Sequence, residues 1–557
     1  MPENILVSVA WPYANGSLHL GHIAGCYLPS DIFARYHRLK GNNVLMVSGS
    51  DEHGTPITLR AEQEGISPAE VAQKYHKEFL ECWDKLGITF DLFTHTDTEN
   101  HAAVTHDIFL RLLEKGYIYK GSMLQPYCPT DKRFLPDRYV EGTCPYCDFN
   151  GARGDQCDQC GRTLNPNELK NPRCRICATP PVFETSEHFF LKLSAFEEKL
   201  QKWVGDKTFW RQNVRKFTLG FLEGGLKDRA ITRDIEWGVT VPQPGFEKKR
   251  IYVWFEAVIG YLSASKEWAK SHGDAEGWKP FWTGESKSYY FIGKDNIPFH
   301  TIIWPAMLMG YGGLNVPYDV PANEFLTIEG KKLSTSRNWA VWLPDYLQRY
   351  DPDPLRYYLS INMPETGDTN FSWHEFLRKN NDELVATYGN LVNRVLTFTN
   401  RNFGAVVPEP GELDEASKGL LEKAESTLKE VDKQLYACHF KEALKAAMAL
   451  AQDVNRYLDD TAPWKMLKQD RLVAARSVYT AIGAISALKT MLYPFLPFTS
   501  QKLHNYLGFE GDIRDAGWCV QLPAAGQKLP QPQALFVKLE DKIVEEEMAR
   551  LGSGGPA

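Results

Sequence analysis

The chain has 557 residues, enough for three to four domains with several buried cores. Hydrophobic residues make up 43% and charged residues 24%, which is ordinary for a folded globular protein and excludes disordered and fibrous classes. The 63 Lys and Arg residues are outnumbered by 70 Asp and Glu residues. The net charge of −7 disfavours a protein that coats nucleic acid without sequence preference.

The first fifty residues have the pattern of a strand, a helix and a second strand. An apolar run at 5–10 predicts a strand, residues 19–38 have helical periodicity with a kink expected at Pro29, and a second strand is expected at 44–47. Strands that alternate with helices predict a parallel sheet, whose ligands bind at the carboxyl ends of the strands.

Residues 120–185 are rich in Cys, Pro, Gly and Asp and predict a small insertion held by metal ions. Two Cys-x-x-Cys pairs with nine residues between them predict a structural Zn²⁺ site with four thiolate ligands: Cys144, Cys147, Cys157 and Cys160. A second candidate zinc site consists of Cys128, Asp131, Cys174 and Cys177. Clustered, metal-type cysteines are typical of a reducing compartment, so a cytoplasmic protein is expected.

Beyond the insertion the chain returns to an α/β pattern and then becomes helical. Strands are expected at 251–255 and 289–292 and a helix at 300–309, whereas 375–498 is almost wholly helical. The apolar stretch at 478–498 is interrupted by Lys and Pro residues, which is typical of a buried helix and not of a membrane span. The N-terminus has no basic region followed by an apolar run, so no leader and no membrane partner are expected.

His19 and His22 stand where the first predicted strand turns into the first helix. They lie three residues apart and therefore share a face of the first helical turn, whose free N–H groups attract anions. Gly21 between them lets a nucleotide approach the backbone closely. The two imidazoles can donate hydrogen bonds to phosphate oxygens in a transition state. The alternative for so short a match is a pair of solvated surface histidines.

A second polar motif follows Gly330, in a loop with two lysines, three hydroxyl residues and an arginine, Lys331–Arg337. A mobile loop of this composition suits a lid over a triphosphate, and a solvated basic turn is the alternative. Both motifs in one α/β chain, in this order, resemble the signatures of class I aminoacyl-tRNA synthetases. HLGH matches the first signature, and KLSTS is a variant of the second, which is usually Lys-Met-Ser-Lys-Ser.

Longer segments around the two motifs resemble methionyl-tRNA synthetases of the form that carries zinc knuckles. The resemblance runs from about Asn4 to Leu551 and rests on AWPYANGSLHLGH, SGSDEHGTP, RFLPDRYVEGTCPYC, YVWFEAVIGY, FIGKDNIPFHTIIWPAML and APW. It implies an α/β, Rossmann-type class I catalytic domain with an inserted zinc-binding connective domain, followed by an all-α anticodon-binding bundle. The implied enzyme is a methionine–tRNA ligase, which converts methionine and ATP into methionyl-adenylate. It then transfers the aminoacyl group to the 3′-terminal adenosine of tRNA(Met), for translation initiation and elongation.

The same resemblance implies a domain organisation. The two halves of the catalytic domain are expected at 1–118 and 236–325, on either side of the connective insertion at 119–235. The other expected parts are a signature-loop and stem-contact region at 326–375, the anticodon-binding domain at 376–530 and a C-terminal tail at 531–557. Because no dimerisation domain is seen at the C-terminal end, a monomer is expected.

The resemblance also implies the residues that bind and activate ATP. His19, His22 and Lys332 are the implied catalytic residues: the histidines stabilise the pentavalent phosphate, and the lysine neutralises the leaving pyrophosphate. The implied ATP-binding residues are His19, Gly21, His22, Gly293, Asp295, Lys332, Ser334, Thr335 and Ser336, with Mg²⁺ accompanying the nucleotide.

A methionine pocket needs apolar, polarisable walls, because sulfur packs favourably against aromatic rings. The residues that the resemblance implies for it are Tyr13, Asp51, Trp254, Ala257, Tyr261, Ile297 and His300. Asp51 ends the second predicted strand and can pair with the substrate ammonium group. Without the resemblance, Trp and Tyr at these spacings would be interpreted as core. Three positions depart from the family pattern: Trp11 stands where the best-known members have Leu, Glu256 replaces an Asp, and Thr335 replaces the second Lys of the loop.

In the helical domain, the resemblance implies that Asn390, Arg394 and Trp464 bind the anticodon. Asn390 and Arg394 share a helix face; Arg can contact base edges or phosphates, and Trp can stack an unpaired base. In an unrelated bundle they would be a surface Arg and a core Trp. Two rival functions are a synthetase for another apolar amino acid and an RNA-binding protein without activity. The zinc-type insertion, unlike a long editing domain, argues against the first, and the intact catalytic residues argue against the second.

Overall fold

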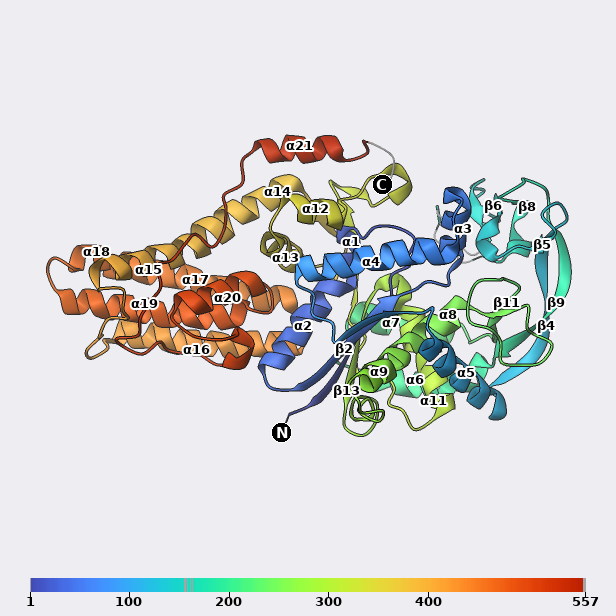
Figure 1. Ribbon diagram of the computed structural model, residues 1–557, viewed down its shortest axis with the longest axis horizontal. Coiled ribbons are helices and arrows are strands. Elements are labelled where there is room, and N and C mark those ends of the chain that lie inside the picture. The colour runs from blue at the N-terminus through green and yellow to red at the C-terminus, as the bar shows by residue number, and fades with distance from the viewer. Residues whose placement is uncertain (1, 155–156, 158, 161, 163, 554–557) are drawn as a thin grey trace.

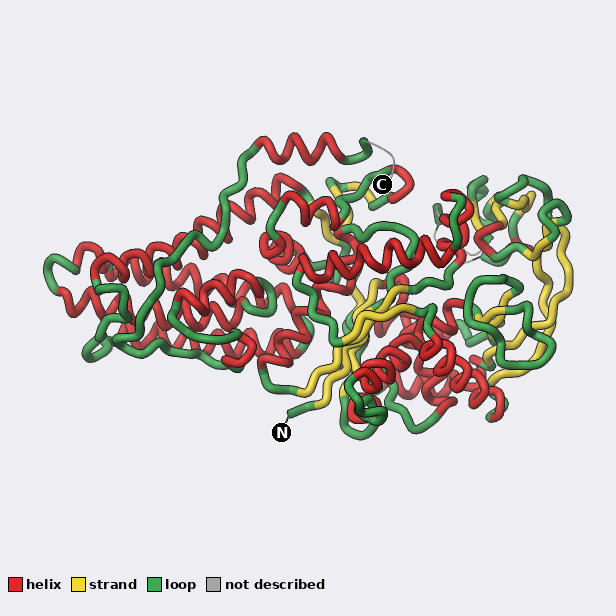
Figure 2. The backbone as a smooth tube through the Cα atoms, in the orientation of Figure 1, coloured by secondary structure: helices red, strands yellow, loops and turns green. Residues whose placement is uncertain are grey.

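The computed structural model describes residues 2–154, 157, 159–160, 162 and 164–553. The molecule is elongated, with an α/β region and a Cys-rich extension towards one end and a helical bundle at the other (Figures 1 and 2). The expected α/β region and helical bundle are therefore both present.

A sheet of five parallel strands lies in the middle of the molecule, in the order β14, β13, β1, β2, β3. The strands are β1 (Asn4–Val9), β2 (Asn43–Ser50), β3 (Leu92–His95), β13 (Lys287–Gly293) and β14 (Ala322–Asn323). The strands expected at 44–47 and 289–292 are confirmed. Helices α2 (Leu28–Leu39) and α9 (Gly260–Ser271) pack against the sheet. The other principal helices of this region are α3 (Thr55–Glu64), α4 (Pro68–Leu86), α5 (Glu99–Glu114) and α11 (Trp304–Tyr311).

The helix expected at 19–38 is present, but its first part is wider than an α-helix. α1 (Leu20–His22) leads into a π-helix, η1 (Ile23–Tyr27), and α2 follows with Pro29 in its first turn. Proline has no N–H to offer the carbonyl one turn earlier. The side chain of Asn323 donates to Ala24 O at 2.7 Å and so satisfies a carbonyl of this turn from outside the helix. The irregularity expected at Pro29 thus falls on the turn that precedes it.

The strand expected at 251–255 is wrong. β12 covers only Arg250–Ile251, and α8 runs from Val253 to Glu256. The N–H groups of Phe255 and Glu256 both donate to Tyr252 O, which closes a helical turn. A short apolar run is compatible with a buried strand or a buried helix, and periodicity alone cannot separate them. The helix expected at 300–309 is confirmed as the π-helix η7 (Phe299–Ile303) followed by α11.

The Cys-rich insertion is built on a long antiparallel hairpin. β4 (Ile118–Cys128) pairs with β9 (Val182–Leu191) along its length, and β10 (Arg229–Ala230) and β5 (Arg133–Phe134) complete that sheet. At the far end, β6 (Val140–Thr143), β7 (Ala152–Arg153) and β8 (Lys170–Cys174) form a second small sheet. Helices α6 (Glu197–Gly205) and α7 (Gln212–Glu223) return the chain to the α/β region.

The helical bundle is confirmed. Its principal helices are α15 (Asn390–Asn402), α16 (Glu415–Tyr436), α17 (Phe440–Thr461), α18 (Pro463–Met466), α19 (Arg471–Leu492) and α20 (Pro497–Tyr506), preceded by α14 (Trp373–Arg378) and a π-helix, η9 (Lys379–Gly389). By length and composition α19 could cross a membrane, but 78% of its apolar window is buried inside the protein. It packs against α16 and α17, so its composition is that of the bundle's core helix.

A connecting region joins the parallel sheet to the bundle. It contains β15 (Leu326–Ile328), β16 (Lys331–Lys332), β17 (Thr369–Phe371), α12 (Leu343–Arg349) and α13 (Pro352–Ile361). After α20 the chain runs back along the bundle, and α21 (Lys542–Arg550) packs on α14 (Figure 1). The C-terminal end of the described chain lies beside the connecting region, where Ser553 O accepts from Nδ2 of Asn338.

The buried carboxylate of Asp31 links the α/β region, the connecting region and the bundle. Asp31 of α2 bonds to Arg35 at 2.8 Å and to Arg356 of α13 at 2.6 Å. Burial alone would raise the pKa of Asp31, but the two guanidinium groups lower it to about 2. Arg356 also donates to Phe495 O and Arg35 to the hydroxyl of Tyr493, both in the bundle. One charge cluster therefore contacts the α/β region, the connecting region and the bundle.

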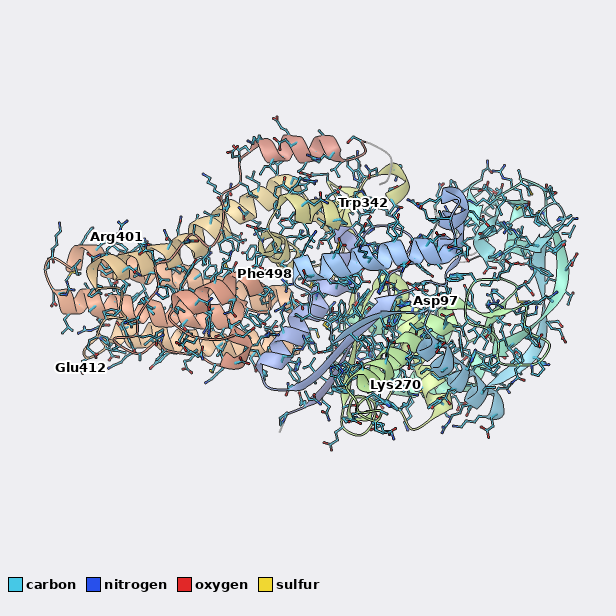
Figure 3. The ribbon with its side chains drawn as sticks, in the orientation of Figure 1. Asp97, Lys270, Trp342, Arg401, Glu412 and Phe498 are labelled. Atoms are coloured by element: carbon cyan, nitrogen blue, oxygen red, sulfur yellow. The ribbon has the colours of Figure 1, made fainter. Side chains whose placement is uncertain are left out.

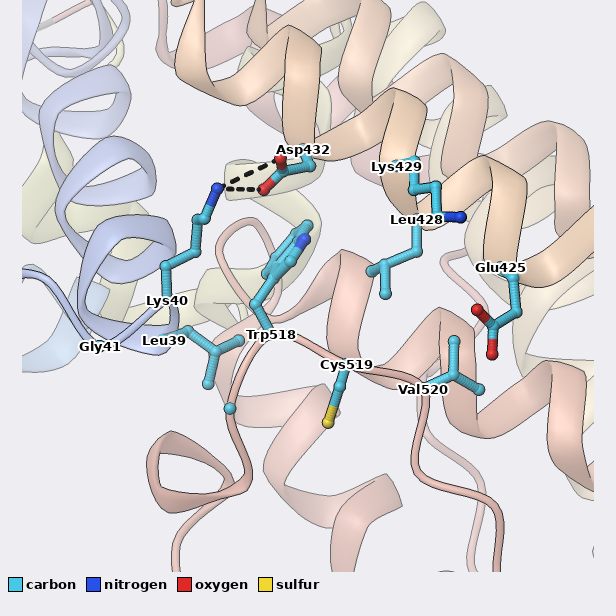
Figure 4. A pocket seen from close by; sticks show the side chains of 11 residues that line it. Leu39, Lys40, Gly41, Glu425, Leu428, Lys429, Asp432, Trp518, Cys519 and Val520 are labelled. Atoms are coloured by element: carbon cyan, nitrogen blue, oxygen red, sulfur yellow. Dashed lines mark hydrogen bonds and ion pairs between the residues drawn. The ribbon is translucent and has the colours of Figure 1, made fainter. Parts of the chain in front are cut away.

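An open cavity of about 600 Å³ lies at the junction between α2 and α16 (Figure 4). Lys40 at the end of α2 and Asp432 of α16 form an ion pair across it, 2.9 Å apart, and Trp518 forms another part of its wall. This cavity is at the opposite end of α2 from His19, so it is separate from the candidate active site.

Candidate active site

The two sequence motifs lie against each other in the fold. A Cβ atom on Gly21 would lie 2.6 Å from Cδ1 of Leu333, so Leu333 of the second motif packs directly on the first. Trp342, labelled in Figure 3, forms a β-bridge with His19. Two backbone hydrogen bonds flank this bridge, from Leu20 N to Val341 O and from Leu343 N to Leu18 O. The contact with Leu333 is possible because residue 21 has no side chain.

His19 and His22 form a stacked pair with ring centroids 3.8 Å apart and an angle of 16° between the rings. His19 N donates to Nδ1 of His22 at 3.2 Å. Nδ1 of His22 is therefore an acceptor, and its Nε2 carries the proton of the neutral ring. Burial lowers the pKa of His22 to about 4, and burial together with His22 lowers the pKa of His19 well below its usual value. Both rings are neutral hydrogen-bonding groups at pH 7.

The lysine-rich loop is a hairpin that extends from β15 and β16. Ser334 and Trp339 close its neck through two backbone hydrogen bonds, and η8 (Thr335–Arg337) forms the tip. Lys331 Nζ lies 4.3 Å from the ring centroid of Trp339. Lys332 is exposed and, as the next residue of β16, points to the opposite side of the strand. Thr335 is exposed at the tip, whereas the side chain of Ser336 lies outside the described part of the structure.

Two of the residues implied for the methionine pocket form a buried hydrogen-bonded pair. Nε2 of His300 accepts from the Tyr261 hydroxyl at 2.7 Å, and Nδ1 of His300 donates to Asn296 O at 2.9 Å. These roles follow because a backbone carbonyl can only accept, and burial lowers the pKa of His300 to about 4 and keeps the ring neutral. Ile297 is buried one turn before His300.

A second group of aromatic rings includes Phe299, which directly precedes His300 in the chain. Tyr13 and Trp254 are nearly perpendicular, with ring centroids 6.1 Å apart, and Trp254 stacks on Phe299 at 4.1 Å. Ala257 follows Trp254 by one turn, in the 3₁₀ turn η5 (Ala257–Ile259). Phe299 is not among the methionine-pocket residues that the resemblance implies. Its position directly before His300 could have suggested that it lies near the pocket. The arrangement offers a flat, polarisable wall of the kind that suits a thioether.

Asp51 follows β2, where it forms a β-bridge with Tyr13. His53 N donates to its Oδ1 at 3.3 Å. Burial and the neighbouring Glu256 raise the pKa of Asp51 to about 8, against the opposing effect of His53. The structure therefore places Tyr13, Trp254 and Asp51 together, and Tyr261 and His300 together.

A buried charge cluster behind Asp51 could not be seen in the sequence. Glu256 is fully buried, and its Oε1 accepts from Nδ1 of His53 at 2.6 Å and from Nε2 of His101 at 3.2 Å. Burial would raise the pKa of Glu256, but His53 outweighs this effect and lowers it to about 2. Burial would lower the pKa of His53, but Glu256 raises it to about 10. Asp97, labelled in Figure 3, lies 3.5 Å from Nε2 of His53.

Trp11 occupies space left by two glycines. A Cβ atom on Gly49 would lie 2.5 Å from the Trp11 ring, and a Cβ on Gly260 would lie 2.7 Å from it. The larger side chain at position 11 is therefore accommodated by the absence of side chains on β2 and α9.

Gly293 ends β13 and Asp295 follows in the 3₁₀ turn η6 (Lys294–Asn296). A Cβ atom on Gly293 would lie 2.8 Å from Oδ1 of Asp295. Glycine at this strand end therefore leaves room for the carboxylate.

The eight candidate metal ligands form two compact clusters. Sulfur atoms lie 3.9 Å apart in the pair Cys144–Cys160 and 3.6 Å apart in the pair Cys147–Cys157, and all four ligand atoms are within 4.8 Å of one another. A tetrahedral zinc with Zn–S bonds of about 2.3 Å sets its sulfurs about 3.8 Å apart, so this donor set fits zinc. In the second cluster Cys128 and Cys177 are 3.3 Å apart, and Cys174 lies 3.1 Å from Asp131.

In the bundle, Arg394 lies over Trp464 with its guanidinium carbon 4.9 Å from the ring centroid. Arg394 also donates to Oδ1 of Asn455 at 3.1 Å. Trp464 is half-buried and follows Ala462, whose φ of 38° turns the chain from α17 into α18. Asn390 is exposed one turn before Arg394 on α15. Arg394 of α15 and Trp464 of α18 are therefore in contact, and Asn390 lies one turn before Arg394 within the same continuous helical stretch.

The profile of the tRNA synthetases class I (M) matches residues 5–396, and that of the anticodon binding domain of methionyl tRNA ligase matches 407–555. Together with the parallel sheet and the two signatures in contact, this defines a class I aminoacyl-tRNA synthetase. A methionine–tRNA ligase of Dehalococcoides mccartyi is 63% identical over 552 residues, which are 99% of this chain and 100% of that protein. One from Thermomicrobium roseum is 53% identical over 580 residues, 99% of each chain.

Solved structures give the same result. A Mycobacterium tuberculosis methionyl-tRNA synthetase in complex with methionyl-adenylate superposes with a TM-score of 0.81 at 26% identity, covering 96% of this chain and 99% of that one. The chain belongs to the methionine–tRNA ligase family. It is an enzyme that activates methionine with ATP and transfers it to tRNA.

Proposed function

We propose that His19, His22 and Lys332 form the site at which ATP reacts with methionine. The observation that carries this assignment is the packing of Leu333 on Gly21, because it places the lysine loop directly over the histidine turn. The methionine carboxylate attacks the α-phosphorus, methionyl-adenylate forms, and pyrophosphate leaves. The adenylate is then attacked by the 3′-terminal adenosine of tRNA(Met).

In this proposal the histidines act as neutral donors. Nε2–H of His22 and the first-turn N–H groups donate to phosphate oxygens as charge builds in the pentavalent transition state, and His19 does the same beside it. Lys332 neutralises the leaving pyrophosphate. Gly21, Gly293, Asp295, Ser334, Thr335 and Ser336 complete the ATP site, and Mg²⁺ accompanies the nucleotide. Positioning and charge stabilisation are sufficient for this chemistry, so no general base is required.

For methionine, we propose that the Asp51 carboxylate receives the substrate ammonium group and that the aromatic wall receives the thioether. Tyr13, Trp254, Ala257, Tyr261, Ile297 and His300 line this pocket. Because His300 accepts from Tyr261, the tyrosine hydroxyl is held in one orientation. A Mycobacterium tuberculosis relative of the same fold was solved in complex with methionyl-adenylate, which supports a methionine site in this chain.

We propose that Cys144, Cys147, Cys157 and Cys160 hold a structural Zn²⁺, and that Cys128, Asp131, Cys174 and Cys177 hold a second. Closed sites of this kind stabilise a fold and leave no position open for a substrate. Both zinc ions would therefore stabilise the fold of the insertion and take no part in the reaction.

For tRNA, we propose that Asn390, Arg394 and Trp464 contact the anticodon. They belong to the anticodon-binding domain, which we place at residues 376–530. We also propose that the protein acts as a monomer. Reduced metal-binding thiols support a cytoplasmic enzyme.

The experiment that tests this proposal is His22→Ala. Loss of one preorganised donor typically costs roughly 10²–10³ in rate, so pre-steady-state formation of methionyl-adenylate should slow by that factor while the fold is kept. His272→Ala, on the exposed end of α9, is the matched control and should react like the unchanged protein. Formation of the adenylate at full speed in folded His22→Ala would remove the histidine turn from the mechanism.

A further inference from the structure

Asn338 connects the lysine-rich loop (Lys331–Arg337) to two other parts of the chain. It follows η8 with a φ of 50°, a left-handed conformation that Asn tolerates better than most residues. Its Nδ2 donates to Ser553 O at 2.8 Å, and its Oδ1 accepts from Nε1 of Trp342 at 2.7 Å. Because a carbonyl only accepts and an indole N–H only donates, these partners determine the orientation of the amide.

The first connection runs to the C-terminal tail. Gly552 N donates to Asn338 O at 3.0 Å, beside the bond from Asn338 Nδ2 to the next residue. The tail is anchored by Glu547 of α21, which is buried and accepts two hydrogen bonds from Arg349, at 2.9 and 3.0 Å, and one from the Tyr350 hydroxyl at 2.9 Å. Bidentate, charge-assisted hydrogen bonds between an arginine and a carboxylate fix the relative orientation of the two side chains as well as adding stability. The tail therefore presents its backbone to the loop in one position.

The second connection runs to the histidine turn. Trp342 pairs with His19 as a β-bridge, and the ring centroids are 6.0 Å apart. The Asn338 side chain therefore lies between the tail on one side and the segment that carries His19 on the other. The backbone bonds between Ser334 and Trp339 shape the loop itself, whereas the Asn338 amide ties it to these neighbours.

We propose that Asn338 is a positioning residue for adenylate formation, which holds the Lys332 loop over the phosphate site by joining it to the C-terminal tail and to Trp342. This inference rests on the role proposed above for Lys332. Without the two side-chain hydrogen bonds, the lysine-rich loop spends less of the time packed on the histidine turn. The use of ATP then suffers, while the methionine pocket, which is built from other elements, keeps its shape.

The test is Asn338→Gly, which keeps a left-handed backbone and removes both side-chain bonds. Two lost hydrogen bonds correspond to roughly a 5- to 150-fold effect. At saturating methionine, adenylate formation should slow by this factor or the KM for ATP should rise by it, while the KM for methionine stays nearly unchanged. Equal increases in both KM values would indicate general loosening of the site and would overturn the proposal.

Glu547→Gln tests the part played by the tail. The change keeps the shape of the side chain and removes the charge that Arg349 binds, so adenylate formation should slow at the same step. Glu540→Gln, an exposed acidic residue before α21, is the matched control and should behave like the unchanged protein. Combined with Asn338→Gly, Glu547→Gln should add less than its single effect, because both act through one contact. Full additivity would contradict the proposed link.

Lys332→Ala, measured in parallel, separates this inference from the proposal on which it rests. If Lys332→Ala reacts at full speed, the role of the loop fails. If Lys332→Ala is slow and folded Asn338→Gly reacts at full speed, the loop acts but Asn338 does not position it.

Discussion

The ionisation of Asp51 ties the proposed methionine site to a property that can be measured. Its pKa of about 8 leaves the side chain largely protonated at pH 7 in the unliganded protein. The proposed role requires the carboxylate, and a bound ammonium group favours that form. Methionine binding and proton release from Asp51 are therefore linked.

The linkage predicts that methionine affinity rises with pH between 6 and about 8. Below the pKa of Asp51, binding must remove a proton, which costs affinity by up to about tenfold per pH unit. Calorimetry in buffers of different ionisation enthalpy should show roughly one proton released per methionine at pH 7. In Asp51→Asn the binding should be weaker and independent of pH over this range. Proton-neutral, pH-independent binding to the unchanged protein would contradict the assignment.

Some residues of the site can be predicted from the sequence, and others become apparent only in the folded structure. His19, His22 and the lysine loop belong to short contiguous motifs, so their chemistry could be predicted from the sequence. Contact between Glu256, His53 and His101 depends on how α8, α5 and the segment after β2 pack together, and no local pattern reports that. The same holds for Asn338, whose partners are a neighbouring Trp and the distant tail.

Among the elements, the Cys-rich insertion gives the sharpest prediction. Purified protein should contain at least one tightly held zinc per chain, because four thiols already lie at the separations that tetrahedral zinc requires. Elemental analysis of Cys147→Ser should show about one zinc fewer, and Cys519→Ser, outside both clusters, should lose none.

A zinc content near two would support the cluster of Cys128, Asp131, Cys174 and Cys177 as a second site. Well under one zinc per chain, in protein that is folded and active, would exclude the first site.

Elements were predictable where the pattern was long or chemically distinctive. The parallel sheet and the helices of the bundle follow from periodicity over many residues. The segment at 251–255 was assigned wrongly because four or five apolar residues fit either structure, and the choice of helix depends on the tertiary surroundings of Phe255 and Glu256. The π-helical form of the turn at 23–27 also depends on a tertiary contact, from Asn323.

Across the whole molecule, the proposed chemistry and the proposed tRNA contacts lie far apart. Figure 1 places α18, which carries Trp464, at the far end of the bundle from α1. The buried cluster of Asp31, Arg35 and Arg356 joins the two halves. The separation allows the two functions to be tested independently.

Trp464→Ala should therefore impair tRNA charging and spare methionine activation. Stacking on an aromatic side chain is worth about 1–3 kcal/mol per base, or roughly one to two powers of ten in aminoacylation efficiency. Methionine-dependent exchange of pyrophosphate into ATP should stay nearly unchanged. Trp518→Ala, at the junction with α2, is the matched control and should leave tRNA charging intact. A folded Trp464→Ala protein that loses both activities equally would show that Trp464 is a core residue.

We propose that this chain activates methionine at the site where the two signature motifs meet. The most direct measurement is ATP–pyrophosphate exchange with each of the twenty amino acids in turn, on purified, folded protein. We expect exchange well above background with methionine and near background with the other nineteen amino acids, and we expect the methionine-dependent exchange to be lost in His22→Ala. Faster exchange with another apolar amino acid, or none with any of the twenty, would contradict this proposal.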